Sequence, residues 1–150
     1  MRLTTFTDYG LRVLIYTASA PEGRTTVPQV AAAFGISEHH LVKVAHQLGK
    51  LGVLKNTRGR GGGIRLARAA SEINVGEVMR AIEGEDVPVE CFDARRNKCR
   101  IAGHCELECA LVEAVQAFHA VLARYTLEDL VRNRRALRVV LHGALAARAP

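Results

Sequence analysis

Two short amphipathic segments separated by a glycine-containing turn constrain the fold of this chain more than any other feature. The first runs from about Pro28 to Phe34 and the second from about Glu38 to Leu51. Between them, Gly35 suits the left-handed residue at a helix end, and Ser37 suits the N-cap of the next helix. The pattern therefore predicts a helix-turn-helix whose second helix turns an apolar stripe toward a core.

A tip rich in glycine and arginine follows this unit and is flanked by two short apolar segments. Residues 53–67 read Val-Leu-Lys-Asn-Thr-Arg-Gly-Arg-Gly-Gly-Gly-Ile-Arg-Leu-Ala, which predicts a β-hairpin. Helical periodicity predicts further helices at about 7–20, 75–82 and 106–125, the last of them long and apolar along one side. The expected fold class is mainly α with a small β-hairpin wing: a winged helix-turn-helix domain plus a long helix.

Charge is distributed unevenly along the sequence. The 150 residues carry a formal net charge of +6, and acidic residues are absent between positions 39 and 71. The cations in that stretch are Lys43, Lys50, Lys55, Arg58, Arg60, Arg65 and Arg68. A charged helix face is most often simply solvated, but here it coincides with a helix-turn-helix order and a basic hairpin. The combination predicts double-stranded DNA as a partner.

On this interpretation, two groups of residues face a DNA duplex. The start of the second helix of the helix-turn-helix reads base edges in the major groove, and the hairpin tip follows phosphates or enters the minor groove. The candidate DNA-binding residues are Ser37, His39, His40, Lys43, Arg58 and Arg60. A nucleotide-binding loop is a weaker interpretation, because no Gly-Lys-Ser/Thr ending opens a helix after the glycines. An RNA-binding Arg-Gly segment is also weaker, because such segments usually come as repeats.

All four cysteines lie between Cys91 and Cys109, with the spacing Cys-x7-Cys-x5-Cys-x3-Cys. The N-terminus lacks a secretory signal, and no apolar run reaches the ~18–20 residues needed to cross a membrane. A cytoplasmic protein with no membrane partner is therefore expected, in a compartment that keeps thiols reduced. Clustered cysteines there favour metal or redox chemistry over disulfides.

The long gaps between the first three cysteines favour an iron–sulfur cluster, since such loops can wrap a centre larger than one ion. Zinc and a thiol switch remain open alternatives, although a structural zinc site usually has two close cysteine pairs. The favoured ligands are Cys91, Cys99 and Cys105. Cys109 falls inside the predicted long helix, where a buried cysteine without a ligand role is expected.

Four segments together resemble a known bacterial family over about residues 1–132. They are Phe6-Thr-Asp-Tyr-Gly-Leu-Arg12, Gly61-Gly-Gly-Ile-Arg-Leu66, the three-cysteine loop and Tyr125-Thr-Leu-Glu-Asp-Leu-Val131. They resemble the winged-helix family that includes the iron–sulfur assembly regulator IscR. The first and last segments are similar to its nitric-oxide-sensing NsrR branch in particular.

The resemblance implies a homodimeric repressor, not an enzyme, that binds a palindromic operator. It implies an iron–sulfur cluster, [2Fe-2S] or [4Fe-4S], held by Cys91, Cys99 and Cys105. Asp8 matches the position that can supply a fourth, non-cysteine ligand from the partner chain. Nitric oxide would act as the signal by disrupting the cluster and abolishing DNA binding. The alternatives are a zinc-stabilised or thiol-redox DNA-binding regulator, and an electron carrier that uses the cluster.

These expectations divide the chain into four parts. Residues 1–82 form the winged helix-turn-helix domain, and 83–105 form the cluster-binding loop. Residues 106–132 form the dimerisation helix and a short C-terminal helix. Residues 133–150 form a tail rich in arginine and alanine, whose conformation the sequence does not predict.

Overall fold

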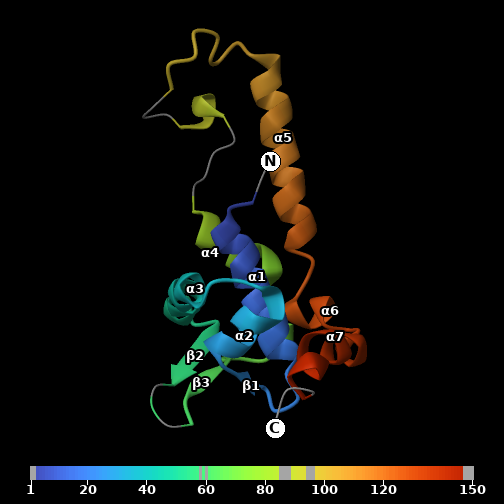
Figure 1. Cartoon of the computed structure of the whole chain (residues 1–150). Helices are drawn as coiled ribbons and strands as arrows, with labels where there is room; N and C mark the ends of the chain where they lie inside the picture. The colour runs from blue at the N-terminus through green and yellow to red at the C-terminus, as the bar shows by residue number, and fades with distance from the viewer. Residues whose placement is uncertain (1–2, 58, 60, 85–88, 94–96, 147–150) are drawn as a thin grey trace.

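A helical body with one long projecting helix makes up the computed structural model, which describes residues 3–57, 59, 61–84, 89–93 and 97–146 (Figure 1). In chain order the elements are α1 (Thr5–Ser19), β1 (Arg24–Thr25), α2 (Val27–Phe34), α3 (Glu38–Lys50), β2 (Leu54–Thr57), β3 (Gly63–Leu66), the 3₁₀ turn η1 (Ala70–Glu72), α4 (Val75–Glu83), the 3₁₀ turn η2 (Glu90–Phe92), α5 (Glu106–Leu122), α6 (Leu127–Leu130) and α7 (Arg134–Ala146). The predicted fold class, mainly α with a small wing, is confirmed.

The helix-turn-helix is formed by α2 and α3, and local capping explains where each begins. Thr26 and Gln29 form a capping box at the start of α2, in which the Thr26 amide donates to the Gln29 side chain at 2.8 Å. Gly35 ends α2 in the left-handed conformation, with φ of 65°. Ser37 occupies the N-cap position of α3, but its hydroxyl makes no capping hydrogen bond.

The predicted hairpin is present, and a third strand joins it. The three strands form an antiparallel sheet in the order β1-β3-β2, so β3 lies in the middle. Ile64 of β3 pairs with Thr25 on one side and Asn56 on the other. Gly63 allows β1 to come this close, because a Cβ there would lie 2.5 Å from the Thr25 carbonyl oxygen. The sequence did not predict β1, since two residues are too short to show an alternating pattern.

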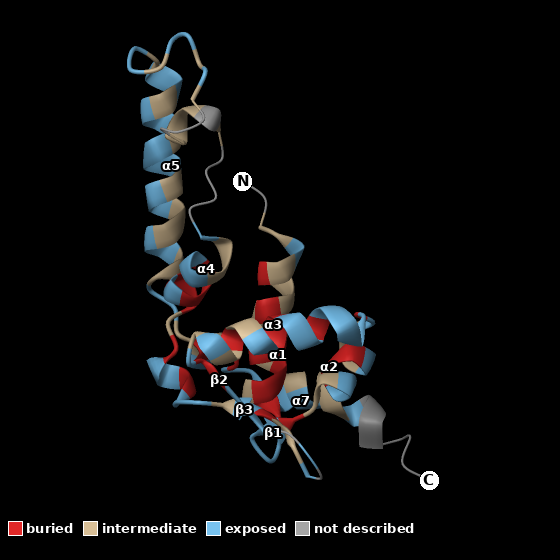
Figure 2. Cartoon of the chain, turned by 90° about the vertical axis from the view of Figure 1, so that its left-hand side faces the viewer, coloured by how far each residue is buried: buried red, intermediate tan, exposed pale blue. Residues whose placement is uncertain are grey.

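The core lies around α1, which runs through the middle of the body and packs against α3, α4, α6 and α7 (Figure 2). The largest fully buried side chains are Tyr16, Leu14, Leu41, Leu48, Ile73, Met79 and Leu127. Each helix that contacts α1 contributes an apolar stripe to this core, so α1 sets the position of the rest of the body.

The N-terminus of α1 is tied to the C-terminus of α4. Thr4 is the N-cap, so α1 begins two residues earlier than the predicted 7–20 helix, and Thr4 accepts a hydrogen bond from the Thr7 amide at 3.2 Å. Glu83 accepts hydrogen bonds from the Thr4 amide at 2.9 Å and the Thr4 hydroxyl at 3.1 Å. Partial burial acts to raise the pKa of Glu83, but hydrogen bonds from Thr7 and Thr4 outweigh it and leave that pKa lowered.

Most of the C-terminal tail folds as α7, which packs against α1 and α2. The Arg138 guanidinium donates to the Ser19 carbonyl at the end of α1, at 3.0 Å. The His142 ring lies 4.2 Å from the Tyr16 ring, centroid to centroid, and its Nε2 lies 3.1 Å from the Ser19 hydroxyl. Burial lowers the pKa of His142, a hydrogen bond that its ring donates to the Tyr16 backbone opposes this, and the nearby Arg138 charge lowers the pKa further.

The long helix α5 projects from the body and has no buried residue. It ends at Leu122, three residues earlier than expected, because groups at the start of α4 donate hydrogen bonds to the backbone carbonyls of the turn that follows. The Asn74 side chain donates to the Ala123 carbonyl at 2.7 Å, and the Val75 amide donates to the Tyr125 carbonyl at 2.9 Å. Within the described ranges, every helix is too short or too polar to cross a membrane.

We predict that Gly76→Ala destabilises the protein. A Cβ at this position would lie 2.8 Å from the backbone nitrogen of Ala123, so α4 and the end of α5 would have to separate. The expected loss is about 1–3 kcal/mol, as for other overpacked contacts, measured as a lower midpoint of urea unfolding. The matched control is Gly143→Ala in α7, whose new Cβ would lie 4.0 Å from the Arg138 carbonyl oxygen. The control should be neutral or stabilising, and equal losses in both variants would contradict the prediction.

Candidate DNA interface and cysteine loop

The outer face of α3 is polar and basic. Leu41, Val44 and Leu48 turn inward and are fully buried, which leaves the opposite side of the helix open along its whole length (Figure 2). The exposed side chains on that face are His39, Lys43, His46 and Lys50. Val42, 55% exposed, adds an apolar surface beside them. The sequence interpretation selected His39 and Lys43 but missed His46 and Lys50, because it considered only the start of the helix.

His40 occupies a different part of the surface of α3. Its ring centroid lies 6.5 Å from that of Tyr9 in α1. The two residues share a small apolar pocket of about 210 Å³ with Phe6 and the stem of Lys43. His40 is exposed, but it lies on the side of α3 that adjoins α1; the stem of Lys43 also lines this pocket, whereas His39 does not.

The wing is fixed to α3 by one side chain of β2. The Asn56 amide donates to the Ala45 carbonyl of α3 at 2.9 Å. Gly49 makes room for it, since a Cβ there would lie 2.8 Å from the Asn56 nitrogen. This bond sets the position of the hairpin relative to α3. The two candidate wing residues, Arg58 and Arg60, lie outside the described residues.

The cysteine loop connects α4 to α5 and carries three of the four thiols. Cys91 lies in η2, Cys99 follows in the loop and Cys105 is the N-cap residue of α5. All three are free and half-buried. Cys109 is also free, but it is exposed on α5, so the expectation that it is buried is wrong. The helix carries it away from the body because no element packs over that side.

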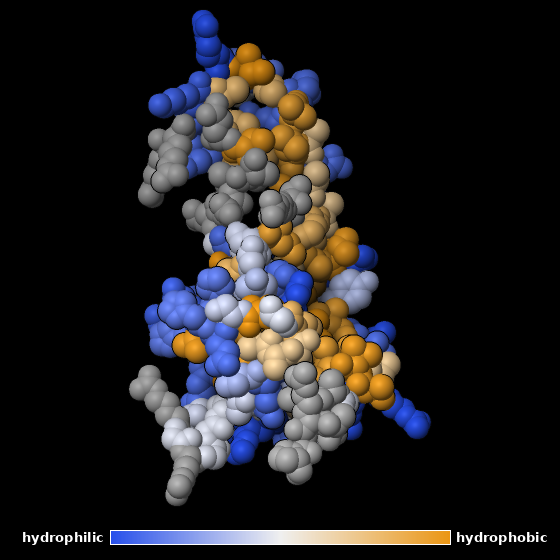
Figure 3. All heavy atoms as spheres, in the orientation of Figure 1, coloured by the Kyte–Doolittle hydropathy of each residue, from blue (hydrophilic) through white to orange (hydrophobic). Residues whose placement is uncertain are grey.

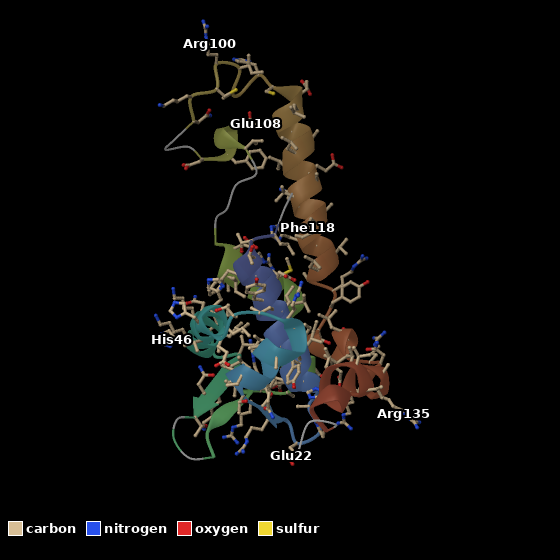
Figure 4. The ribbon with its side chains drawn as sticks, viewed as in Figure 1. Glu22, His46, Arg100, Glu108, Phe118 and Arg135 are labelled. Atoms are coloured by element: carbon tan, nitrogen blue, oxygen red, sulfur yellow. The ribbon has the colours of Figure 1, made fainter. Side chains whose placement is uncertain are left out.

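Burial and nearby charged groups both act on the pKa of Cys91. Desolvation raises the pKa of Cys91, and the Glu108 carboxylate raises it further. A backbone hydrogen bond opposes this rise, and Cys99 and Cys105 add smaller contributions that raise the pKa of Cys91. Figure 4 shows Glu108 on the side of α5 that faces the loop. Mutual influence of this kind fits a set of thiolate donors that a positively charged centre would neutralise.

Asp8 is not part of this group. Its carboxylate forms a two-point contact with Arg12 one turn later in α1, with an Arg12 Nη2–Asp8 Oδ2 distance of 2.8 Å and an Nε–Oδ1 distance of 3.0 Å. In the part of the chain that the structure describes, no three His, Cys, Asp or Glu side chains are arranged to hold a single metal ion.

A helix-turn-helix with a basic outer face, followed by a hairpin wing, defines a winged-helix DNA-binding protein. Residues 3–133 match the Rrf2 family, described as iron-dependent transcriptional regulators. The chain belongs to the Rrf2 family, and it is a transcriptional regulator rather than an enzyme. The matched region ends just before α7.

Individual relatives agree with this assignment. The chain is 49% identical over 135 residues to the HTH-type transcriptional regulator NsrR of Bacillus subtilis, covering 89% of this chain and 92% of that protein. Its fold is similar to that of T. potens IscR, with a TM-score of 0.70, 25% identity and coverage of 89% and 88%. It is also similar to CymR, the global cysteine regulator of B. subtilis, with a TM-score of 0.66, 30% identity and coverage of 89% and 98%.

We predict that Lys43→Ala weakens binding to operator DNA. The exposed ammonium group on the outer face of α3 would neutralise one phosphate, so its loss should reduce the slope of log affinity against log salt by about 1 for each bound subunit. Fluorescence anisotropy over a salt series measures both quantities. Arg135→Ala removes the same charge from an exposed site on α7 (Figure 4) and should leave the slope unchanged. Equal slopes for wild type and Lys43→Ala would place Lys43 away from the DNA.

Proposed function

We propose that the chain is a cytoplasmic, nitric-oxide-sensitive repressor whose operator binding is controlled by an iron–sulfur cluster. The observation that carries this proposal is the group of three free thiols in the loop between α4 and α5. The name of the B. subtilis relative supports it, as does the resemblance of the α1 and α6 segments to the nitric-oxide-sensing branch.

In this proposal Cys91, Cys99 and Cys105 hold the cluster, as [2Fe-2S] or [4Fe-4S]. When bound, the cluster supplies iron that reacts with nitric oxide. The thiols fix one end of the loop to η2 and the other to the first turn of α5. Loss of this thiolate anchorage frees the loop between α4 and α5, and therefore changes how the two helices are held relative to each other.

Asp8 of the partner subunit is the proposed fourth ligand. Its carboxylate is bound to Arg12 in the isolated chain, so coordination would require exchange of one cationic partner for another. Oxygen is a weaker ligand for iron than thiolate in such centres. An oxygen ligand would therefore leave one corner of the centre open to attack.

Dimerisation is proposed to use the outer face of α5. Hydrophobic side chains gather along this helix in Figure 3, and five of them repeat with the alternating three- and four-residue spacing of a helix–helix seam. They are Leu107, Ala110, Ala114, Ala117 and Val121. Leu107 is 64% exposed and Val121 is 43% exposed in the single chain. Small residues at the centre of this stripe would let two helices approach closely.

The proposed DNA contacts follow from the geometry of α3 and the wing. His39 and Lys43 would read or line the major groove, Ser37 would contact the backbone at the start of α3, and His40 would lie at the edge of the contact. Arg58 and Arg60 at the wing tip would bind phosphates or the minor groove. Two such surfaces in a homodimer would match a palindromic operator with half-sites about 34–36 Å apart.

The division of labour in this proposal follows the chain. Residues 1–82 bind DNA, 83–105 hold the cluster and 106–132 pair with the partner subunit. Of the 133–150 tail, α7 supports the back of α1 and α2. A change in the loop therefore acts on the DNA surface through α4 and α1, and on the half-site spacing through α5.

Anaerobic reconstitution with iron and sulfide tests the ligand set. Wild type and Cys109→Ala should give coloured protein with a visible absorption band, because Cys109 is exposed on α5 and outside the proposed ligand set. Single alanine variants of Cys91, Cys99 and Cys105 should lose iron and colour. Iron and acid-labile sulfide analysis gives the cluster content.

A nitric oxide titration with an operator gel shift then tests the function. Reconstituted wild type should release the operator as the cluster absorption bleaches, and the three ligand variants should bind weakly throughout. A triple alanine variant that binds the operator normally and still responds to nitric oxide would contradict the proposal. A colourless protein that carries zinc would instead favour the zinc-stabilised alternative.

We predict that Ala114→Glu disrupts the dimer. A carboxylate at the centre of the outer stripe would be buried without a partner between two helices, which is strongly unfavourable. Sedimentation should show a monomer, and operator affinity should fall because two half-sites are no longer bound together. Gln116→Glu adds the same charge on the side of α5 that faces the groove near Cys109, and it should remain dimeric. A dimeric Ala114→Glu would place the interface elsewhere.

A further inference from the structure

A row of three cationic side chains crosses the sheet at the base of the wing. The strand register pairs Arg24 with Arg65 and Lys55 with Arg65. Residues directly opposite each other on antiparallel strands point to the same side of the sheet, and all three of these are exposed. Leu54 and Ile64, their neighbours along the strands, are buried in the core. The row therefore lies on the solvent face of the sheet.

This row is unfavourable for the isolated protein. Like charges directly opposite each other destabilise a sheet. Within the described residues the ion pairs are Arg12–Asp8 and Arg132–Asp129, so no carboxylate neutralises the row. Arg24 donates to the Gly61 carbonyl of the wing at 2.7 Å, which directs its guanidinium along the hairpin. A bound polyanion would neutralise these three cations and so remove the repulsion between them.

We propose that Arg24, Arg65 and Lys55 bind the phosphate backbone of DNA that flanks each operator half-site. The inference rests on the proposed operator binding. Lys55 lies on β2, the strand that packs against α3, so the row begins beside the DNA-reading helix and runs outward to β1. The wing extends beyond α3 in Figure 1, and guanidinium and ammonium groups are the usual phosphate ligands.

DNA is favoured over other polyanions because the row lies on the sheet whose strand β2 packs against the DNA-reading helix α3. A duplex bound to α3 and extended past the half-site would place its next phosphates near the sheet, and bending toward the protein would increase the contact. Contacts of this kind are insensitive to base sequence. The protein should therefore prefer a longer duplex without any preference for the sequence of the added flanks.

Two duplexes test the inference with the full-length protein. Both carry an operator core selected from a random library by the wild type, and one adds about ten base pairs, one helical turn, of arbitrary sequence on each side. Wild type should bind the longer duplex more tightly and with a steeper salt dependence. Arg65→Gln should lose this flank preference, with a slope on the longer duplex that is lower by about 2, one contact for each subunit of the proposed dimer, while its affinity for the short duplex is unchanged.

Two control variants separate charge from structure. Arg65→Lys keeps the positive charge in the row and should keep the flank preference. Arg135→Gln removes one charge from α7 and should also keep the flank preference.

Thermal unfolding gives a readout that a purely structural arginine would not produce. In low salt, Arg65→Gln should unfold at a higher temperature than wild type, and the difference should shrink at about 1 M salt, where the Debye length is about 3 Å.

Several outcomes would overturn the inference. Wild type that binds both duplexes equally, or a flank preference that survives in Arg65→Gln, would show that the row does not contact flanking DNA. Arg65→Gln that is less stable than wild type at all salt concentrations would make the arginine structural. Binding to phosphatidylserine vesicles that Arg65→Gln abolishes, without a flank effect, would assign the row to a membrane surface. Protein that selects no operator core at all would contradict the proposed function as well, whereas core binding without flank preference would overturn this inference alone.

Discussion

Burial of α1 is the interaction on which the rest of the molecule depends. Val13, Leu14 and Tyr16 are each 1% exposed, and the helices that carry the candidate DNA surface, the start of the cysteine loop and the C-terminal segment all pack against α1. Loss of one large buried side chain costs about 2–5 kcal/mol, a substantial part of the roughly 5–15 kcal/mol that stabilises a small domain. The single helix α1 therefore fixes the positions of both α3 and the start of the loop.

A short series of side-chain contacts connects the loop to the candidate DNA surface. Ile82 and Glu83 end α4 immediately before the loop, and both contact α1: Glu83 through its hydrogen bonds to Thr4, and Ile82 through close packing on Gly10. A Cβ on Gly10 would lie 3.0 Å from the Ile82 side chain and 3.9 Å from Val44 of α3. A displacement of the end of α4 would therefore move α1 first, and then α3, which packs directly behind α1.

The sequence predicted most of the fold because its signals were local. Gly35 and the apolar period of α3 placed the helix-turn-helix, and the glycine-rich tip placed the hairpin. The strand β1 and the cross-strand cation row were missed, because register depends on contacts between residues far apart in sequence. Spacing selected Cys91, Cys99 and Cys105 as candidate ligands, and that selection stays a prediction. The exposure of Cys109 could not be predicted, because an apolar helix stripe does not show which part of it another element will cover.

The absence of any buried residue in α5 has a consequence for how the protein behaves at low concentration. A helix of this length is marginal in water on its own, so its order must come from what covers it. In the proposed homodimer the second subunit would supply that cover, and dilution would remove it. Because Cys105 is the N-cap residue of this same helix, dilution of the protein would loosen the first turn of α5 and with it the position of the Cys105 thiol. The readiness of the loop to take up iron would then depend on how many copies of the chain a cell contains.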